Sequence, residues 1–205
     1  MKPANSLKSP KVVIHTHGCK LNQADSQVLA QEFQQAGFTV VRTAAQADVV
    51  VLNSCTVTAN SDSKARQYLR RARRNNPDAL VVATGCYAQR AKDELSVMES
   101  ASLILDNRDK PTLVSTVAAK LNIATDHPVQ KQPEAALGRS RAMVKIQEGC
   151  DQVCAYCIVP KVRGRERKFR SCSRGGPHAG SALAEFGPLA TSPSPASSIK
   201  GICNT

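Results

Sequence analysis

The sequence predicts an α/β fold with a parallel sheet over residues 11–122. Short apolar runs alternate with amphipathic stretches, which is the order of strands and helices in such a sheet. Two of the runs, Ala47–Asn53 and Ala79–Thr84, are continuous and rich in valine, as expected for strands buried on both faces. Cysteines follow three of the runs, at positions 19, 55 and 86.

Each element has a local reason in the sequence. Strands are expected at Lys11–Thr16, Phe38–Val41, Ala47–Asn53, Ala79–Thr84 and Ser102–Leu105. Helices are expected at Asp25–Gly37, Asn60–Asn75, Tyr87–Leu95 and Lys110–Leu121. The first helix places Val28, Leu29, Phe33 and Ala36 on one face, and Gly37 ends it.

The helix expected at Asn60–Asn75 has an apolar and a basic face. Asn60 or Ser61 would cap its start, and Asn76-Pro77 would end it. The apolar residues recur at a helical period, at Ala65, Tyr68, Leu69 and Ala72. The other positions carry the basic residues Lys64, Arg66, Arg70, Arg71, Arg73 and Arg74.

Cys19, Cys55 and Cys86, here called the rim cysteines, each follow the carboxyl end of an expected strand. In an open parallel sheet these ends share one edge, where ligands bind. We therefore expect the three sulfurs to lie within reach of one metal centre, or to reach it after small loop shifts. The alternative is three unrelated buried cysteines, since free cysteine is among the most buried residue types. His15 and His17 adjoin Cys19 and are expected to be a strand residue and a loop residue rather than ligands.

A second set, here called the loop cysteines, has C-x3-C-x2-C spacing at Cys150, Cys154 and Cys157. Thiolates are soft ligands that suit zinc, copper(I) or iron–sulfur clusters. Zinc sites usually have four protein ligands in two pairs, and no fourth partner follows in the next dozen or so residues. Three cysteines on a cluster would leave one iron open to a substrate or cofactor. A zinc knuckle or a redox-inert loop is the alternative.

The formal net charge of +12 indicates a polyanionic partner, and nucleic acid fits best. A second basic run follows the loop cysteines, at Lys161, Arg163, Arg165, Arg167, Lys168 and Arg170. Both the basic helix face and this basic run could contact a phosphate backbone. The alternatives are a solvated helix face for the first and a charged loop for the second. No secretory leader and no apolar run of membrane-spanning length is found, so we expect a cytoplasmic protein without a membrane partner.

Four segments carry a resemblance to a known family. They are His15–Ser26, Ala47–Thr58, Ala83–Arg90 and Val144–Arg165. Together they resemble the methylthiotransferase family of radical S-adenosylmethionine (SAM) enzymes, over roughly Lys11–Lys168. The likeness is strongest to the branch that modifies N6-threonylcarbamoyladenosine in tRNA. The isopentenyladenosine branch comes second, and the branch acting on a ribosomal-protein aspartate third.

The resemblance implies the chemistry of both cysteine sets. The loop cysteines would hold the 4Fe–4S cluster that cleaves SAM, with Tyr156 near the adenine of SAM. The rim cysteines would hold an auxiliary 4Fe–4S cluster that carries or donates sulfur. One SAM would supply a methyl group, and another would be cleaved to the radical that removes hydrogen from C2 of the adenine. The partners would be tRNA, bound by Arg66, Arg70, Arg73, Arg74, Arg163 and Arg165, and an electron donor such as a flavodoxin or ferredoxin.

The expected organisation is a Rossmann-like methylthiotransferase domain at 11–122, a linker at 123–140 and the start of a radical SAM barrel at 141–170. Residues 171–205 are rich in Gly, Ser, Pro and Ala, and are expected to be a disordered or aberrant tail. Because the likeness stops near Phe169, we expect a truncated chain that does not methylthiolate tRNA by itself. We also expect the chain to be a monomer.

Two other functions stay open at this point. The first is a zinc-stabilised RNA-binding module that uses the basic helix and the basic run. The second is a scaffold whose Lys11–Leu121 domain does no chemistry. Iron and sulfide content would separate these from the enzyme.

Overall fold

The computed structural model describes residues 9–123, 145–152 and 154–168. Its contacts divide the chain into residues 1–167 and 168–205. In chain order the elements are β1 (Lys11–His17), α1 (Lys20–Gln35), β2 (Thr39–Val40), the 3-10 helix η1 (Ala44–Gln46), β3 (Val49–Ser54), α2 (Ala59–Asn75), β4 (Leu80–Gly85), α3 (Cys86–Arg90), α4 (Lys92–Val97), β5 (Leu103–Leu105), the 3-10 helix η2 (Lys110–Thr112), α5 (Leu113–Lys120), β6 (Gln147–Glu148), α6 (Val159–Arg163) and β7 (Arg167–Lys168). No described helix is long and apolar enough to span a membrane.

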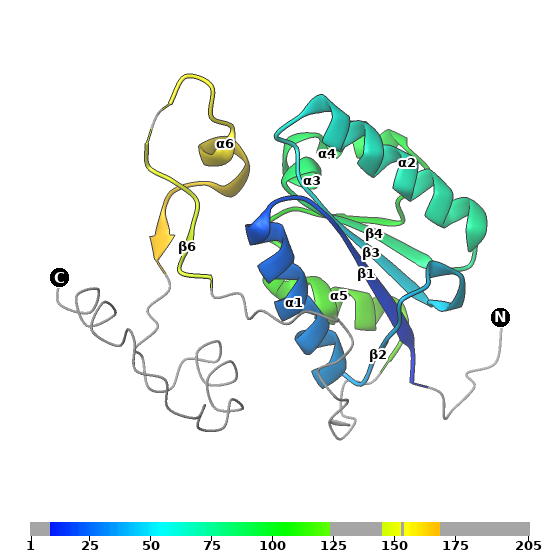
Figure 1. Cartoon of the computed structure of the whole chain (residues 1–205). Coiled ribbons are helices and arrows are strands. Elements are labelled where there is room, and N and C mark those ends of the chain that lie inside the picture. The colour runs from blue at the N-terminus through cyan, green and yellow to red at the C-terminus, as the bar shows by residue number, and fades with distance from the viewer. Residues whose placement is uncertain (1–8, 124–144, 153, 169–205) are drawn as a thin grey trace, which may run out of the picture. The chain divides into compact units, whose positions relative to one another are not determined.

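Five strands form one parallel sheet in the order β2-β1-β3-β4-β5 (Figure 1). This confirms the predicted α/β fold with a Rossmann-like parallel sheet. The order changes direction at β1 and β3, since the chain first adds β2 on one side of β1 and then β3, β4 and β5 on the other. In sheets of this kind the ligand site lies outside the carboxyl ends of the strands.

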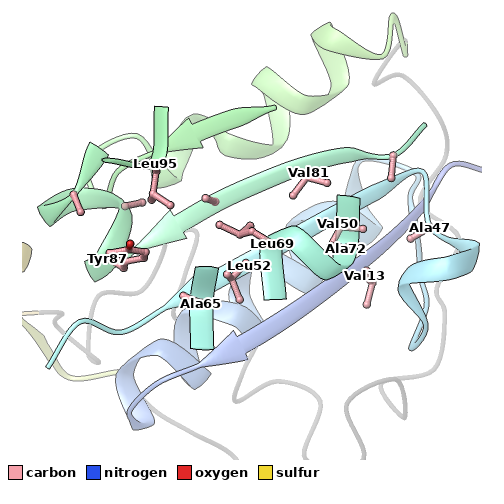
Figure 2. Close-up of a cluster of buried hydrophobic side chains, with 14 residues drawn as sticks. Val13, Ala47, Val50, Leu52, Ala65, Leu69, Ala72, Val81, Tyr87 and Leu95 are labelled. Atoms are coloured by element: carbon pink, nitrogen blue, oxygen red, sulfur yellow. The ribbon is translucent and has the colours of Figure 1, made fainter. Parts of the chain in front are cut away.

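Helices cover both faces of the sheet, and two apolar clusters fill the layers. On one face, α2, α3 and α4 pack against the sheet through a cluster that includes Leu52, Leu69, Val81, Tyr87 and Leu95 (Figure 2). On the other face, α1 and α5 pack through the second cluster. All six residues of β3 are buried, because this central strand is covered on both sides. The continuous apolar run in the sequence has the same cause.

Helix α1 begins five residues earlier than the sequence pattern predicts, at Lys20 rather than Asp25. Its buried face runs through Asn22, Asp25 and Ser26 before it reaches Leu29 and Phe33. Polar residues therefore occupy the core positions of the first two turns, where an apolar period cannot reveal a helix. The prediction that Val28 lies on the buried face is wrong, since this residue is 37% exposed.

The other helices differ from the predictions in smaller ways. Thr58, rather than Asn60 or Ser61, caps α2, and its Oγ1 accepts a hydrogen bond from the Ser61 amide at 3.1 Å. The helix expected at Tyr87–Leu95 is two helices, because Ala91 leaves the helical region with φ −126° and ψ 45°. In α2, Ala65, Leu69 and Ala72 are buried as predicted.

Residues 145–168 contain the short two-stranded sheet β6-β7 and the helix α6. Of the strand expected around Ala142–Gln147, only Gln147 lies in a strand, and residues 141–144 lie outside the described part. The start of a radical SAM barrel therefore stays a prediction. The tail at 171–205 and nearly all of the linker at 123–140 also lie outside the described residues.

Candidate functional site

The strand register brings the rim cysteines to one edge of the sheet. His17 of β1 is paired with Ser54 of β3, and Ser54 is paired with Gly85 of β4. Cys55 and Cys86 come directly after two of these residues, and Cys19 comes two residues after the third. The Cys55 amide donates to the His17 carbonyl at 2.6 Å, which ties the first two loops together. Three cysteines from distant parts of the sequence thus follow the same ends of three adjacent strands.

The rim thiols affect one another electrostatically. Burial raises the pKa of the Cys55 thiol, and Cys86 and Cys19 raise it further, against the hydrogen bond that the Val57 amide donates to the Cys55 sulfur at 3.5 Å. Cys55 and Cys86 are buried and Cys19 is exposed, and all three are free thiols.

The donor set fits a thiophilic metal or cluster, but the thiols would have to move together to bind it. Within residues 9–123, 145–152 and 154–168, no three His, Cys, Asp or Glu side chains are already arranged around a metal position. Three free thiols at one edge offer the soft ligands that iron–sulfur clusters and zinc both accept. Ligation by the rim cysteines therefore stays a prediction.

Gly85 sets the position of Cys86. It has φ +98° and ψ −164°, a combination that only glycine adopts without strain. A Cβ atom added there would also lie 2.6 Å from Asn53 Oδ1 and 2.7 Å from the Ser54 amide nitrogen. The chain can therefore turn from β4 directly into α3, and so place Cys86 at the edge, only because residue 85 has no side chain.

A buried amide pair holds the Cys19 and Cys55 loops behind the edge. Asn53 Nδ2 donates to the Asn22 carbonyl and to Ser26 Oγ, both at 2.9 Å. Asn22 Nδ2 in turn donates to Asn53 Oδ1 at 3.1 Å, and Asn22 Oδ1 accepts from the Cys19 thiol at 3.2 Å. These contacts connect the beginning of α1 with the end of β3.

His15 and His17 form an aromatic cluster with Tyr68 of α2. The two Nε2 atoms are 2.8 Å apart, and the His15 ring stacks on Tyr68 with centroids 4.1 Å apart. Burial, and then the charge of His17, lowers the pKa of His15 to about 4, so it is neutral at pH 7. Both residues lie in β1, so the sequence-based placement of His17 in a loop is wrong.

The loop cysteines lie in a turn beside α6. Gly149 precedes them at φ +75°, and the Cys150 amide donates to the Gly164 carbonyl at 3.2 Å. The Cys157 amide donates to the Cys154 carbonyl at 3.1 Å, which closes the turn. Cys154 is exposed and the other two cysteines are half-buried. Tyr156 is 93% exposed, so it is accessible to a ligand and makes little packing contact.

Asp25 lies in a buried charged group that was not predicted from the sequence. Its Oδ2 accepts from Lys110 Nζ at 2.7 Å and from Arg163 Nη1 at 3.1 Å, and its Oδ1 accepts from Lys145 Nζ at 2.8 Å. Glu148 accepts from Lys145 and Arg163 as well, at 2.9 Å each. The available signal was an acid at a core position of α1, where an apolar residue is usual.

The basic residues divide into two groups. Arg66, Arg73 and Arg163, predicted to bind RNA, have partners within the chain. Arg66 contacts Tyr87 and Glu94, Arg73 contacts the carbonyls of Pro77 and Ala79, and Arg163 is buried. Arg70, Arg74 and Arg165 are exposed, as are Lys64 and Arg71. Of these exposed cations, Lys64, Arg70, Arg71 and Arg74 lie on α2, and Arg165 lies after α6.

Comparison with known proteins places this geometry in context. Residues 11–106 match the family described as "Uncharacterized protein family UPF0004". The chain is 35% identical over 175 residues to a protein of Aquifex aeolicus named "Threonylcarbamoyladenosine tRNA methylthiotransferase MtaB", covering 77% of this chain and 41% of the relative. A Bacillus subtilis protein of the same name is 35% identical over 164 residues, covering 75% and 36%.

A third relative, from Bacteroides thetaiotaomicron, is named "tRNA-2-methylthio-N(6)-dimethylallyladenosine synthase". It is 33% identical over 179 residues, covering 81% of this chain and 39% of the relative. The chain thus spans about two fifths of the length of these relatives. Residues 11–106 of this chain thus match the family UPF0004, and the chain is similar to relatives that are named as tRNA methylthiotransferases.

Proposed function

We propose that this chain supplies the auxiliary-cluster domain and the SAM-cluster loop of a tRNA methylthiotransferase that acts on N6-threonylcarbamoyladenosine. One observation carries the proposal: three cysteines follow three paired strands of one sheet, in a chain that is 35% identical to relatives named for this reaction. The relative named for dimethylallyladenosine keeps that modified base as the second candidate substrate.

The two cysteine sets have separate roles in this proposal. Two 4Fe–4S clusters and SAM would supply the one-electron and sulfur-transfer chemistry that side chains cannot perform at an unactivated C–H bond. The rim cysteines would hold the auxiliary cluster, and the loop cysteines the SAM cluster. Tyr156, exposed next to Cys157, would contact the adenine of SAM. The protein would contribute ligation and orientation, and a flavodoxin or ferredoxin would deliver electrons.

The outer face of α2 is the proposed contact for tRNA. Its cations Lys64, Arg70, Arg71 and Arg74 are exposed and lie on one helix. Such cations bind phosphates by releasing counterions, so affinity should fall steeply as the salt concentration rises. Arg165 is exposed and follows the loop cysteines in the sequence. It would extend the proposed contact to residues 154–168.

Iron binding and product formation test the function together. The chain, reconstituted with iron and sulfide without oxygen, should be brown and should bind two clusters. Replacing the rim cysteines by Ala should remove one cluster, and replacing the loop cysteines should remove the other. The matched control changes Cys172 and Cys203, the two cysteines outside both sets, to Ala and should leave both clusters in place. A colourless, zinc-containing protein would contradict the enzyme and support the RNA-binding module.

Mass spectrometry of tRNA identifies the substrate. A strain that lacks its own methylthiotransferases would express either this chain or an intact relative. The intact relative should produce the 2-methylthio form of threonylcarbamoyladenosine. The absence of product from this chain alone remains a prediction, and the same measurement checks it. If this chain gave a 2-methylthio product on isopentenyladenosine, the second candidate would replace the proposed substrate.

A further inference from the structure

We propose that Arg163 is a positioning residue that joins the loop-cysteine segment to the rim. Asp25 anchors one side of its guanidinium, and the sulfur of Cys86 receives a hydrogen bond from the other side once it is a thiolate or a cluster ligand. The anchoring half stands on contacts within the protein alone. The sulfur half rests on the rim site of the proposed function.

The anchor is a buried ion pair between parts of the chain that are 138 positions apart. The Arg163 side chain is 3% exposed, and its Nη1 donates to Asp25 Oδ2 at 3.1 Å and to Glu148 Oε1 at 2.9 Å. Asp25 also receives the ammonium groups of Lys110 and Lys145. A charge this buried is tolerated only with partners, so loss of Asp25 would leave cations buried without their shared carboxylate.

The other nitrogen of the same guanidinium has no acceptor. Arg163 Nη2 is fully buried and makes no hydrogen bond. A buried donor left unsatisfied costs about 1–3 kcal/mol, and more when the group is charged. The structure therefore contains a donor that lacks one acceptor, in a place that water does not reach.

Cys86 is the proposed acceptor for that donor. It is the first residue of α3, against which α6 packs. Asn107 Nδ2 bridges the two helices, since it donates to the Val162 carbonyl at 2.7 Å and lies 4.0 Å from Cys86 Sγ. Burial lowers the pKa of Arg163, but Cys86 and then Asp25 more than restore it, so the net shift is upward. The Cys86 sulfur thus affects the pKa of Arg163. It becomes a stronger hydrogen-bond acceptor when it carries negative charge.

This arrangement has a consequence for the rim centre. Hydrogen bonds and positive charge next to a ligating sulfur stabilise the reduced cluster and raise its reduction potential. Lysine keeps the charge but cannot reproduce the planar fork that reaches Asp25 and Cys86 together. Arg163→Gln should therefore lower the potential, and Arg163→Lys should lower it by less.

The sulfur half is tested on the full chain with the loop cysteines changed to Ser, loaded with iron and sulfide without oxygen. An EPR-monitored redox titration then reads the rim centre alone. We expect a more negative midpoint potential in Arg163→Gln at unchanged iron content. Lys161→Gln removes the same charge from the exposed side of α6 and should leave the potential unchanged. Equal potentials in Arg163→Gln and the parent would overturn the sulfur contact.

The anchor is tested without any metal, by hydrogen exchange of the full apo chain. Asp25→Asn and Arg163→Gln should both accelerate exchange of the α6 amides, whereas Lys161→Gln should not. Unchanged exchange in the first two variants would overturn the anchor. Failure of the parent to bind iron would refute the proposed rim centre and with it the sulfur contact, while the exchange measurement still decides the anchor.

Discussion

Glycine at position 85 shows how one residue type can decide where a thiol is placed. Its backbone conformation and its contacts both exclude a side chain, because Ser54 and Asn53 occupy the space where a Cβ atom would lie. Gly164 has a similar φ of +76° but nothing within 4 Å of its Cβ position. The two glycines thus separate a purely conformational requirement from a steric one.

Replacing these glycines by alanine should have unequal effects. Gly164→Ala adds only conformational strain, roughly 1–3 kcal/mol of unfolding free energy. Gly85→Ala adds a collision with the backbone of β3 and should destabilise the protein by clearly more than that. Urea denaturation of the two variants and the parent measures the difference. Equal losses would mean that Gly85 is required for its dihedral angles alone.

Asp25 and Arg163 could not be assigned from the sequence. An acid in the first turns of a helix and an arginine in a basic run both have ordinary solvent-exposed explanations. Their pairing depends on a contact between positions 138 apart, which no local pattern contains. The rim cysteines were easier, because each follows a strand that its own apolar run predicts, and parallel pairing then brings the strand ends together.

At the scale of elements, the strands were the most predictable part. All five strands of the parallel sheet begin and end within two residues of the predicted bounds. A strand buried on both faces, such as β3, needs a continuous apolar run. Helix boundaries failed where polar residues fill core positions, as in the first turns of α1. The break between α3 and α4 also has no sequence signal, because Ala91 is a good helix former.

Helix α2 depends on its narrow apolar stripe for attachment to the sheet. Leu69 is fully buried in the cluster that α2 shares with β3 and β4 (Figure 2). Leu69→Ala should lower the free energy of unfolding by about 2–5 kcal/mol, because it leaves a cavity. The neighbouring Arg70→Ala should stay within about 0.5 kcal/mol, since its side chain is exposed. Chemical denaturation compares the two, and a similar loss in both would exclude this packing.

At the scale of the whole molecule, charge links distant parts of the described chain. Burial raises the pKa of Asp25, but Lys110, Lys145 and Arg163 outweigh it and hold the pKa at about 2, below its usual 3.8. Folding therefore favours the ionised form. The associated stabilisation is complete above about pH 4 and is lost as the pH falls toward 2.

Asp25→Asn should remove this pH dependence. A shift of nearly two pKa units corresponds to roughly 2–3 kcal/mol of unfolding free energy at neutral pH. The difference between parent and variant should be largest above pH 4 and should shrink as the pH approaches 2. Asp93→Asn, at an exposed site in α4, is the control and should follow the parent. A constant difference between pH 5 and 2 would show that the carboxylate does not titrate as described.

The central place of β3 in the sheet would also govern when the proposed rim centre can assemble. Neither Cys19 nor Cys86 can meet Cys55 until β1 and β4 have both paired with β3. Iron and sulfide for the proposed rim centre would then be delivered after folding. The loop cysteines lie within eight consecutive residues, 150–157. They could therefore bind their proposed cluster on a nascent or unfolded polypeptide. The two proposed centres would therefore assemble in separate stages. Chaperones that act on folded proteins would serve only the rim centre.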